Sequence, residues 1–487
     1  MSASAVAAKH QSWLAVDAYL QSHAKHPLVG FGSMRDWLQQ VGRAIPSAIR
    51  GSVISTTGMT AEVAGFPVPV GAQVSIDRLS GDPLAAEVIG FREQVTRIAP
   101  LGKLDGIRYG APVRLRQTHR NLKVGPLLLG RVLDASGECR DGQPPPRLPS
   151  RVQPDQVAPG TVDRQSIKRP LSTGIRAIDT FLTFGLGQRV GIFSGAGVGK
   201  SLLLGTLVRQ AQADVVVVAL IGERGREATE FLERELDPEV RARSVVVVAT
   251  SGEPAIRRVQ AAQTATAIAE FFRDSGKHVL LVMDSLSRFA AAQREIGLAN
   301  GEPPTTRGYP PSVFAQLPKL VERAGCTHRG TITGCYAVLV EGDNLNEPVS
   351  DCVRSLLDGH IVLSRELAAR DHYPAIDVLG SLSRLMPQVA TPRQRESASA
   401  LRDMLAVLAE YEDLIAIGAY RQGTNPRLDS AICCRDELDH FLRQGLRLCA
   451  EPRRTQEWAF RIAEKYRAGC ARPSVAAVAG TVLEPEN

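Results

Sequence analysis

Residues 189–205 read Arg-Val-Gly-Ile-Phe-Ser-Gly-Ala-Gly-Val-Gly-Lys-Ser-Leu-Leu-Leu-Gly, and this stretch decides the fold. An apolar run leads into a glycine-rich loop, and a second apolar run follows Lys200 and Ser201. Glycines let backbone N–H groups approach phosphate oxygens at the positive end of a helix dipole. The pattern therefore predicts a strand, a phosphate-binding loop and a helix that begins at Lys200. A merely flexible glycine-rich turn is the weaker alternative, because apolar residues flank the loop on both sides.

Each residue of this loop has an expected role. The Lys200 ammonium can reach the β- and γ-phosphates, and the Ser201 hydroxyl can take a coordination position of Mg²⁺. The strict pattern requires glycine at position 194, where this chain has Ser194. The loop predicts binding of a nucleoside triphosphate, with contacts from Gly195, Ala196, Gly197, Val198, Gly199, Lys200, Ser201 and Leu202.

Length and composition point to a globular protein of several domains. A chain of 487 residues is typical of about three domains, and 44% hydrophobic residues suffice for a substantial core. No apolar run approaches the ~20 residues that a membrane-spanning helix requires. The first residues lack the apolar region of a signal peptide. We therefore expect a cytoplasmic protein.

Cysteine spacing and charge are less informative. The eight cysteines are scattered, and the one close pair, Cys433 and Cys434, does not have the spacing of zinc ligands. We expect reduced, structural thiols. The net charge is +7, and a basic amino-terminal part suits nucleic acid, anionic lipid or an acidic partner. An ordinary solvated surface explains this charge equally well, so the choice stays open.

The residue pattern changes at three points along the sequence and so predicts four regions. Residues 1–43 carry two short helical patterns and are expected to dock a partner or to cap the next domain. Residues 44–118 contain short β-rich pieces between glycine and proline turns, which predict a small β-barrel. Residues 119–395 form the expected nucleotide-binding domain, and residues 396–487 are expected to be helical.

Apolar runs in the third region predict a parallel sheet. Continuous runs without alternation are typical of strands that are buried on both faces. The predicted strands are 189–193, 215–221, 245–249 and 279–283. Farther along, one apolar stripe from Leu401 to Ile415 and another from Leu438 to Leu446 each predict an amphipathic helix.

Two carboxylates follow predicted strands at the edge where ligands of open parallel sheets bind. Asp284 ends an apolar strand, as expected of a Walker-B acid that holds the Mg²⁺ shell; capping of the next helix is the alternative. Glu223 is placed to orient a water molecule beside the γ-phosphate. Spacing alone leaves Glu227 as a rival, and either glutamate can instead interact with a helix dipole.

Several motifs resemble known ATPases. The stretches 194–201, 222–227, 283–289 and 372–377 resemble the catalytic β subunit of rotary ATP synthases. The stretches 293–299, 301–314 and 358–365 are closer still to type III secretion ATPases. The resemblance is strong from about Ala44 to Leu448 and implies an α/β, RecA-like P-loop core with a parallel sheet, a preceding β-barrel and a helical carboxyl-terminal domain.

The resemblance also implies roles for individual residues. Glu223 matches the catalytic glutamate, and Arg224 matches the arginine beside it. Arg288 matches an active-site arginine, and Tyr373 matches the aromatic residue that packs on adenine. Arg384 matches the arginine finger that a neighbouring subunit supplies. The sequence alone also allows an arginine at a strand end that pairs with a surface acid. Lys200, Ser201 and Asp284 keep the phosphate and magnesium roles described above.

Two positions depart from the β subunit. Small residues such as Ser194 recur among secretion ATPases, so nucleotide binding is still expected. Ala416 lies near the position where β subunits place a second aromatic residue on adenine. We therefore expect the base to rest on Tyr373 and aliphatic packing, with looser base selectivity.

The resemblance implies an ATP- and Mg²⁺-dependent homohexamer at the cytoplasmic face of the inner membrane. The expected partners are a stator, a central stalk, the export gate, and secretion chaperones with their substrates, and no nucleic acid. The stretch 340–351 is more similar to injectisome than to flagellar export ATPases. A flagellar export ATPase, an RNA-dependent ring helicase or terminator, and a non-catalytic ring subunit are the alternatives. The barrel region offers only Phe66, Phe91 and Tyr109 for stacking on RNA.

Overall fold

The computed structural model describes residues 49–340, 342, 344–445 and 447–471. The elements described below belong to one compact unit, which begins at Arg50. The expected docking segment, 1–43, lies outside the described residues. In the described part, none of the helices combines the length and apolar character needed to cross a bilayer.

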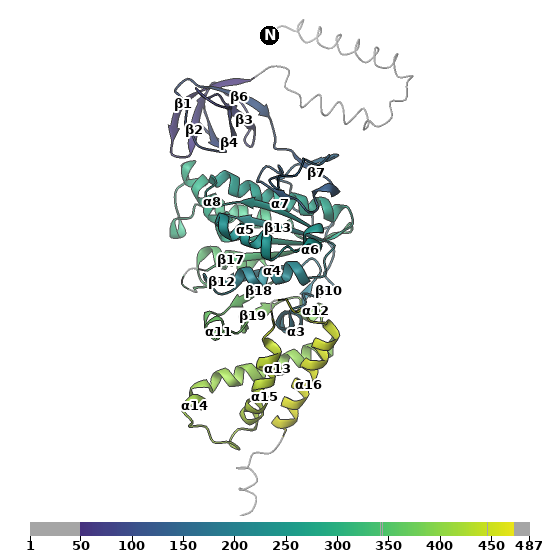
Figure 1. The fold of residues 1–487 in the computed structure, drawn as a ribbon. Helices are drawn as coiled ribbons and strands as arrows, with labels where there is room; N and C mark the ends of the chain where they lie inside the picture. The colour runs from purple at the N-terminus through teal and green to yellow at the C-terminus, as the bar shows by residue number, and fades with distance from the viewer. Residues whose placement is uncertain (1–48, 341, 343, 446, 472–487) are drawn as a thin grey trace, which may run out of the picture. The chain divides into compact units, whose positions relative to one another are not determined.

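The predicted β-barrel is present. Six antiparallel strands close in the order β1-β2-β5-β4-β3-β6 (Figure 1). Buried residues such as Val53, Val63, Val74 and Ile98 fill its interior. The strands are β1 (Arg50–Thr57), β2 (Thr60–Ala64), β3 (Gln73–Ile76), β4 (Leu84–Arg92), β5 (Val95–Pro100) and β6 (Pro112–Gln117).

The central region is a nine-stranded sheet with the order β19-β18-β12-β17-β15-β13-β14-β8, and β16 pairs with β17. The strands from β18 to β8 are parallel, whereas β19 at the edge and β16 are antiparallel. The four predicted strands are confirmed. The strands are β8 (Val132–Leu133), β12 (Arg189–Ser194), β13 (Val215–Ile221), β14 (Ser244–Ala249), β15 (His278–Asp284), β16 (Gly325–Cys326), β17 (Thr331–Leu339), β18 (Gly359–Leu363) and β19 (Ile376–Ser383).

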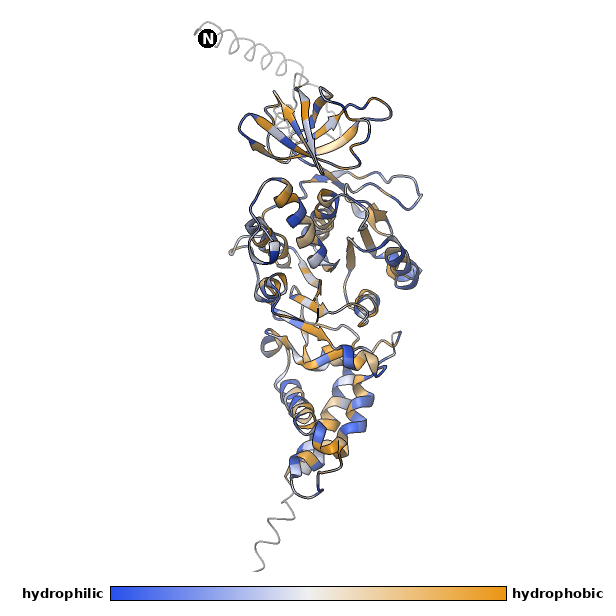
Figure 2. Cartoon of the chain, turned by 90° about the vertical axis from the view of Figure 1, so that its left-hand side faces the viewer, coloured by the Kyte–Doolittle hydropathy of each residue, from blue (hydrophilic) through white to orange (hydrophobic). Residues whose placement is uncertain are grey.

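Helices cover both faces of this sheet, and alternate strand residues point to opposite layers. In β13, Val216 and Val218 belong to the same apolar cluster as α4 and α5. Val217 and Ala219 pack with α7, α8, α9 and α10. The central strands are mostly hydrophobic in Figure 2. These helices are α4 (Lys200–Gln210), α5 (Gly225–Arg234), α7 (Ala255–Asp274), α8 (Leu286–Ala299), α9 (Pro311–Val321) and α10 (Pro348–Leu356).

Short elements connect these layers. The small strands are β7 (Leu122–Val124), β9 (Ser150–Val152), β10 (Pro170–Leu171) and β11 (Phe184–Gly185). The short helices are α3 (Arg176–Phe181), α6 (Pro238–Ala242), α11 (Arg365–Ala369), α12 (Met386–Val389), and the 3-10 turns η1 (Pro126–Leu128) and η2 (Thr306–Gly308).

The carboxyl-terminal region is helical, as predicted. It consists of α13 (Pro392–Glu410), α14 (Glu412–Ala416), α15 (Pro426–Leu442) and α16 (Pro452–Cys470). Thr391 and Gln394 form a capping box at the start of α13, and Asn425 caps α15. Both begin with proline at the first helical position, which a helix accepts because no N–H bond is lost there.

Two predicted helix boundaries are wrong. The stripe from Leu401 to Ile415 is divided between α13 and α14, because the chain leaves helical geometry at Tyr411 (φ −106°, ψ 12°). The second helix ends at Leu442 and does not continue to Leu446. Beyond Leu442, the N–H of Gln444 donates 2.8 Å to the carbonyl oxygen of Tyr373, a partner outside the helix.

A buried ion pair ties α7 to the chain after α9. The Arg323 Nε donates 2.9 Å to Glu270, and the two side chains are only 3% and 4% exposed. Arg323 also donates 2.7 Å to the carbonyl oxygen of Pro154. Both charges are therefore out of water and depend on each other.

We expect Arg323→Met to lower the melting temperature by several degrees, because Glu270 is then buried without a partner. The double variant Glu270→Met/Arg323→Met should melt above the single variant, since an apolar pair carries no desolvation cost. Calorimetry measures both. Arg370→Met, which removes an exposed 3.3 Å pair with Glu412, is the control and should change little. A double variant less stable than Arg323→Met would contradict the account.

Candidate nucleotide-binding site

The glycine-rich loop joins β12 to α4, and the helix begins at Lys200 as predicted. Gly197 (φ 77°) and Gly199 (φ 94°) adopt left-handed backbone conformations, whereas Gly195 does not. Glycine adopts left-handed backbone conformations at a lower energetic cost than other residues, because it has no Cβ atom. Gly199 is the N-cap of α4, and no side chain caps the helix. The first N–H groups of α4 are therefore available to an anion such as a phosphate.

Lys200 brings the two predicted acids together. Its ammonium forms ion pairs with Asp284, at the end of β15, and with Glu223, 3.3 Å away, just after β13. The three side chains are only 12%, 5% and 13% exposed. Burial lowers the pKa of Lys200, but the two carboxylates outweigh burial and raise that pKa above its ordinary value. The ammonium therefore stays charged.

The geometry distinguishes between the alternative roles of the acids, namely helix capping by Asp284 and the rivalry of Glu223 and Glu227. Ser285, and not Asp284, caps α8, since its hydroxyl accepts from the N–H of Arg288 at 3.4 Å. Glu227 occupies the first turn of α5, where an acid interacts favourably with the helix dipole. Glu223 precedes α5 and pairs with Lys200. The geometry therefore favours Glu223 over Glu227 beside the γ-phosphate.

The two predicted arginines lie in different surroundings. A Cβ atom added at Gly222 would meet the Arg288 side chain at 3.0 Å, so Arg288 packs directly against Gly222. Gly222 has φ 70° and its N–H donates to Ala249, which fixes this turn. Arg224 is exposed at the N-cap of α5. Arg288 therefore packs against Gly222, one residue before Glu223, whereas Arg224 is solvent-exposed one residue after it.

The residues expected to hold Mg²⁺ lie around one cavity. Ser201, Asp284, Glu223 and Glu227 line it together with α5. Hydroxyl and carboxylate oxygens are the ligands that Mg²⁺ prefers, so the donor set fits this ion. Ser194 lies at the end of β12, where its carbonyl oxygen accepts from Val340 and its buried hydroxyl has no hydrogen-bond partner in the described part of the chain.

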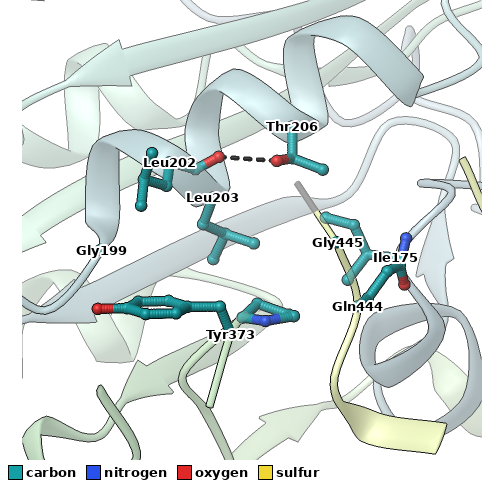
Figure 3. Close-up of a pocket in the computed structure, with 9 residues that line it drawn as sticks. Ile175, Gly199, Leu202, Leu203, Thr206, Tyr373, Gln444 and Gly445 are labelled. Atoms are coloured by element: carbon teal, nitrogen blue, oxygen red, sulfur yellow. Dashed lines mark hydrogen bonds between the residues drawn. The ribbon is translucent and has the colours of Figure 1, made fainter. Parts of the chain in front are cut away.

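Tyr373 lines a small pocket on the other side of the loop (Figure 3). Its ring lies against Gly199, where an added Cβ atom would approach it to 3.1 Å. The remaining lining is mostly aliphatic or backbone, from Ile175, Leu202, Leu203, Thr206, Pro374, Gln444 and Gly445. A planar base can therefore stack on the tyrosine ring beside the start of α4.

The prediction that Ala416 lies beside the base is wrong for this pocket, because Ala416 does not line it. Ala416 lines a different cavity, of about 530 Å³, together with α11, β19, α13 and α15. Gln444 and Gly445 take the carboxyl-terminal side of the Tyr373 pocket. These two residues were missed because the predicted second helix ran to Leu446 and covered them. The aliphatic character of the pocket agrees with the expectation.

Arg384 does not belong to the same cluster. Val190 of β12 pairs with Gly359 of β18, and Gly359 pairs with Ser383 of β19. Arg384 therefore lies level with the start of β12, whereas the glycine loop follows the end of that strand at Ser194. At ~3.3 Å per residue the two are about 13 Å apart along the strand, and two strand spacings of about 4.8 Å separate them sideways.

The Arg384 side chain is exposed and forms no ion pair among the described residues. Its N–H donates 2.9 Å to the carbonyl oxygen of Asp358. The expected alternative, pairing with a surface acid of the same chain, is therefore absent from the described part. Arg384 is therefore an exposed residue at the edge of the sheet opposite to its own glycine loop.

Comparisons with known proteins agree with this site. Residues 174–383 match the model of the ATP synthase alpha/beta family, nucleotide-binding domain. Residues 390–458 match that of the T3SS EscN ATPase C-terminal domain. The chain hydrolyses ATP, because these matches cover the loop, both acids and the helices that follow.

Similar proteins are named for two export machines. A flagellum-specific ATP synthase of Treponema pallidum (strain Nichols) is 50% identical over 396 residues, 81% of this chain and 89% of that protein. A type 3 secretion system ATPase of Xanthomonas euvesicatoria is 49% identical over 395 residues, with the same coverage. The assembled ATPase EscN in complex with its central stalk EscO, from enteropathogenic E. coli, matches with a TM-score of 0.79, 42% identity and coverage of 85% and 100%.

We expect low base selectivity, because the polar groups of this pocket are engaged with backbone. Gln444 bonds to residues 174, 176 and 448, and the Thr206 hydroxyl donates to Leu202. GTP should be hydrolysed with a kcat/KM within about tenfold of that for ATP, whereas a site that reads polar base edges discriminates by ~10⁴ or more. Phosphate release measures both. A preference for ATP above about a thousandfold would contradict this.

Proposed function

The chain belongs to the family of type III secretion and flagellum-specific export ATPases, and from this premise we propose that it works as a homohexameric ring whose ATP hydrolysis drives protein export. The observation that carries this proposal is the separation of Arg384 from Lys200, Glu223 and Asp284. All four residues are expected to serve one reaction. Arg384 lies at one edge of the sheet, and the other three lie at the opposite edge. Two copies of the chain, placed side by side, complete the site.

Each residue then has a defined task in hydrolysis. The N–H groups at the start of α4 and the Lys200 ammonium bind the phosphates. Glu223 orients the attacking water for in-line displacement at the γ-phosphate. The neighbouring copy's Arg384 stabilises the charge that develops on the transferred group. Arg288, packed against Gly222, adds positive charge at the same edge.

Mg²⁺ would be held by Ser201 and Asp284 and would neutralise phosphate charge. Lys200 pairs with both acids, so nucleotide binding has to redirect this ammonium toward the phosphates. Glu223 is then released to accept a hydrogen bond from water. A catalytic role of Arg224, which is exposed at the N-cap of α5, rests on its family match as the arginine beside the catalytic glutamate.

A mixing experiment tests the shared site. Glu223→Gln should bind ATP without turnover, and Arg384→Ala should lose about 10³–10⁵ in rate. In an equimolar mixture that exchanges subunits, about one quarter of interfaces pair an intact Glu223 with an intact Arg384, so activity should return. The phosphate release rate of the mixture measures it. An inactive mixture, despite exchange shown by fluorescence transfer between labelled copies, would falsify a site shared between subunits.

The same family relation suggests partners. The solved relative was assembled and bound to a central stalk, and we propose the same for this chain. We further propose a stator that binds residues 1–43, secretion chaperones with their substrates, and a location at the cytoplasmic face of the inner-membrane export gate. A role on RNA is less well supported, since Phe66 is buried and leaves Phe91 and Tyr109 as the exposed aromatic residues of the barrel.

We propose that the export machine is an injectisome. The similarity of the stretch 340–351 to injectisome ATPases and the match of residues 390–458 to the EscN carboxyl-terminal domain support this choice. Identity does not separate the machines, because flagellum-specific and secretion-system relatives are equally similar.

Deletion of the gene tests this assignment in one strain. Contact-dependent secretion should stop, and motility should stay intact, because a separate flagellar ATPase would serve the flagellum. Secretion assays and swimming on soft agar measure the two outcomes. A strain that secretes normally but does not swim would assign the protein to the flagellum.

A further inference from the structure

A buried glutamine joins the base pocket to the carboxyl-terminal helices. Gln444 is 6% exposed and lies just after α15. Its Oε1 accepts 2.9 Å from the N–H of Arg176, and its Nε2 donates 2.7 Å to the carbonyl oxygen of Gly174 and 2.6 Å to that of Leu448. A buried amide side chain is costly unless it is bonded in this way. The side chain therefore joins the segment 174–176 to the loop that follows α15.

The backbone of the same residue holds Tyr373. The Gln444 N–H donates 2.8 Å to the Tyr373 carbonyl oxygen. The preceding residue, His372, lies 3.2 Å from Asp439 of α15 through its Nδ1 atom. Both residues of the turn that carries the tyrosine ring are thus attached to α15 or to the loop after it. A shift of this helix moves the ring.

The opposite wall of the pocket is attached to the same helices. Ile175 lines the pocket directly before Arg176, whose N–H is held by Gln444. The Arg176 guanidinium lies 5.8 Å from the ring centre of Phe441 in α15 and 5.1 Å from that of Trp458 in α16. Figure 3 shows Tyr373 and Ile175 among the residues that line the pocket. Gln444 holds the first through its bond to the Tyr373 carbonyl oxygen and the second through its bonds to the flanking residues Gly174 and Arg176.

We infer that Gln444 is a positioning residue, through which the carboxyl-terminal helices set the distance between Tyr373 and Ile175 and hence the affinity for the base. The inference rests on the proposed role of Tyr373 as the surface on which the base stacks. Gln444 itself does not touch phosphate, since it lies on the base side of α4. Its effect is therefore confined to base binding.

Gln444→Leu tests this in the full-length protein. Leucine is similar in size but loses all three side-chain hydrogen bonds. The dissociation constant of ATP, measured with a methylanthraniloyl-ATP probe, should rise about tenfold. The affinity of inorganic tripolyphosphate, measured by competition, should stay within about twofold, because it carries no base. An equal loss for both ligands would mean a general structural defect and would overturn the inference.

Gln210→Leu is the matched control. Gln210 donates 3.0 Å to the same Leu448 carbonyl oxygen but bonds neither to Tyr373 nor to Arg176. This variant should bind ATP as the wild type does. If Gln210→Leu weakens ATP as much as Gln444→Leu, the loop at Leu448 is responsible and the inference is wrong. Gln444→Met replaces the leucine variant if the latter does not fold.

A double variant separates this inference from the proposed function. Tyr373→Ala should weaken ATP binding, and adding Gln444→Leu should then cost much less than it does in the wild type, because the Gln444 side chain holds the wall opposite to the tyrosine ring and that spacing matters only while the ring is present. Unchanged binding by Tyr373→Ala would remove the tyrosine from its proposed role. Weakened binding by Tyr373→Ala combined with normal binding by Gln444→Leu would overturn the positioning role alone.

Discussion

One ammonium group holds the catalytic edge of the sheet together. Lys200 follows β12, Asp284 ends β15 and Glu223 follows β13, and the three side chains meet in an almost dry environment. Without Lys200, two buried carboxylates would face one another unpaired, which is strongly unfavourable. The pair of acids is therefore stable only with a cation between them. The lysine fills this place and becomes available to phosphate when nucleotide and metal bring other charges.

The direction of the strands underlies the proposal that the site is shared between two copies of the chain. Parallel strands put all their carboxyl ends on one edge, so the loop and both acids gather there. The antiparallel β19 delivers Arg384 to the other edge. A site made from both edges requires a second copy of the chain. The carboxyl-terminal helices follow Arg384 in the chain. Through Gln444 they contact Arg176 and Tyr373, and so support the pocket that we propose for the base.

Sequence patterns predicted the elements with strong local signals. The glycine loop, the buried strands and the barrel all have regular spacing or characteristic residues, and the structure confirms them. The break at Tyr411 has no glycine or proline, so the apolar periodicity ran past it. At the end of α15 the prediction also passed over Gly445, a glycine of the kind that follows helix ends. Beyond α15 the chain instead makes a contact distant in sequence, the bond from the Gln444 N–H to the Tyr373 carbonyl oxygen. The choice between Glu223 and Glu227 likewise required the position of Lys200.

A structure of the assembled protein with Mg²⁺, ADP and aluminium fluoride tests the central claim most directly, because this complex imitates the transferred phosphoryl group. We predict that Lys200 contacts the β-phosphate and the fluoride, that Glu223 no longer pairs with it, and that Arg384 of the neighbouring copy lies at the fluoride. A fluoride group surrounded only by residues of one chain, with Arg384 remote from every nucleotide, would contradict the account.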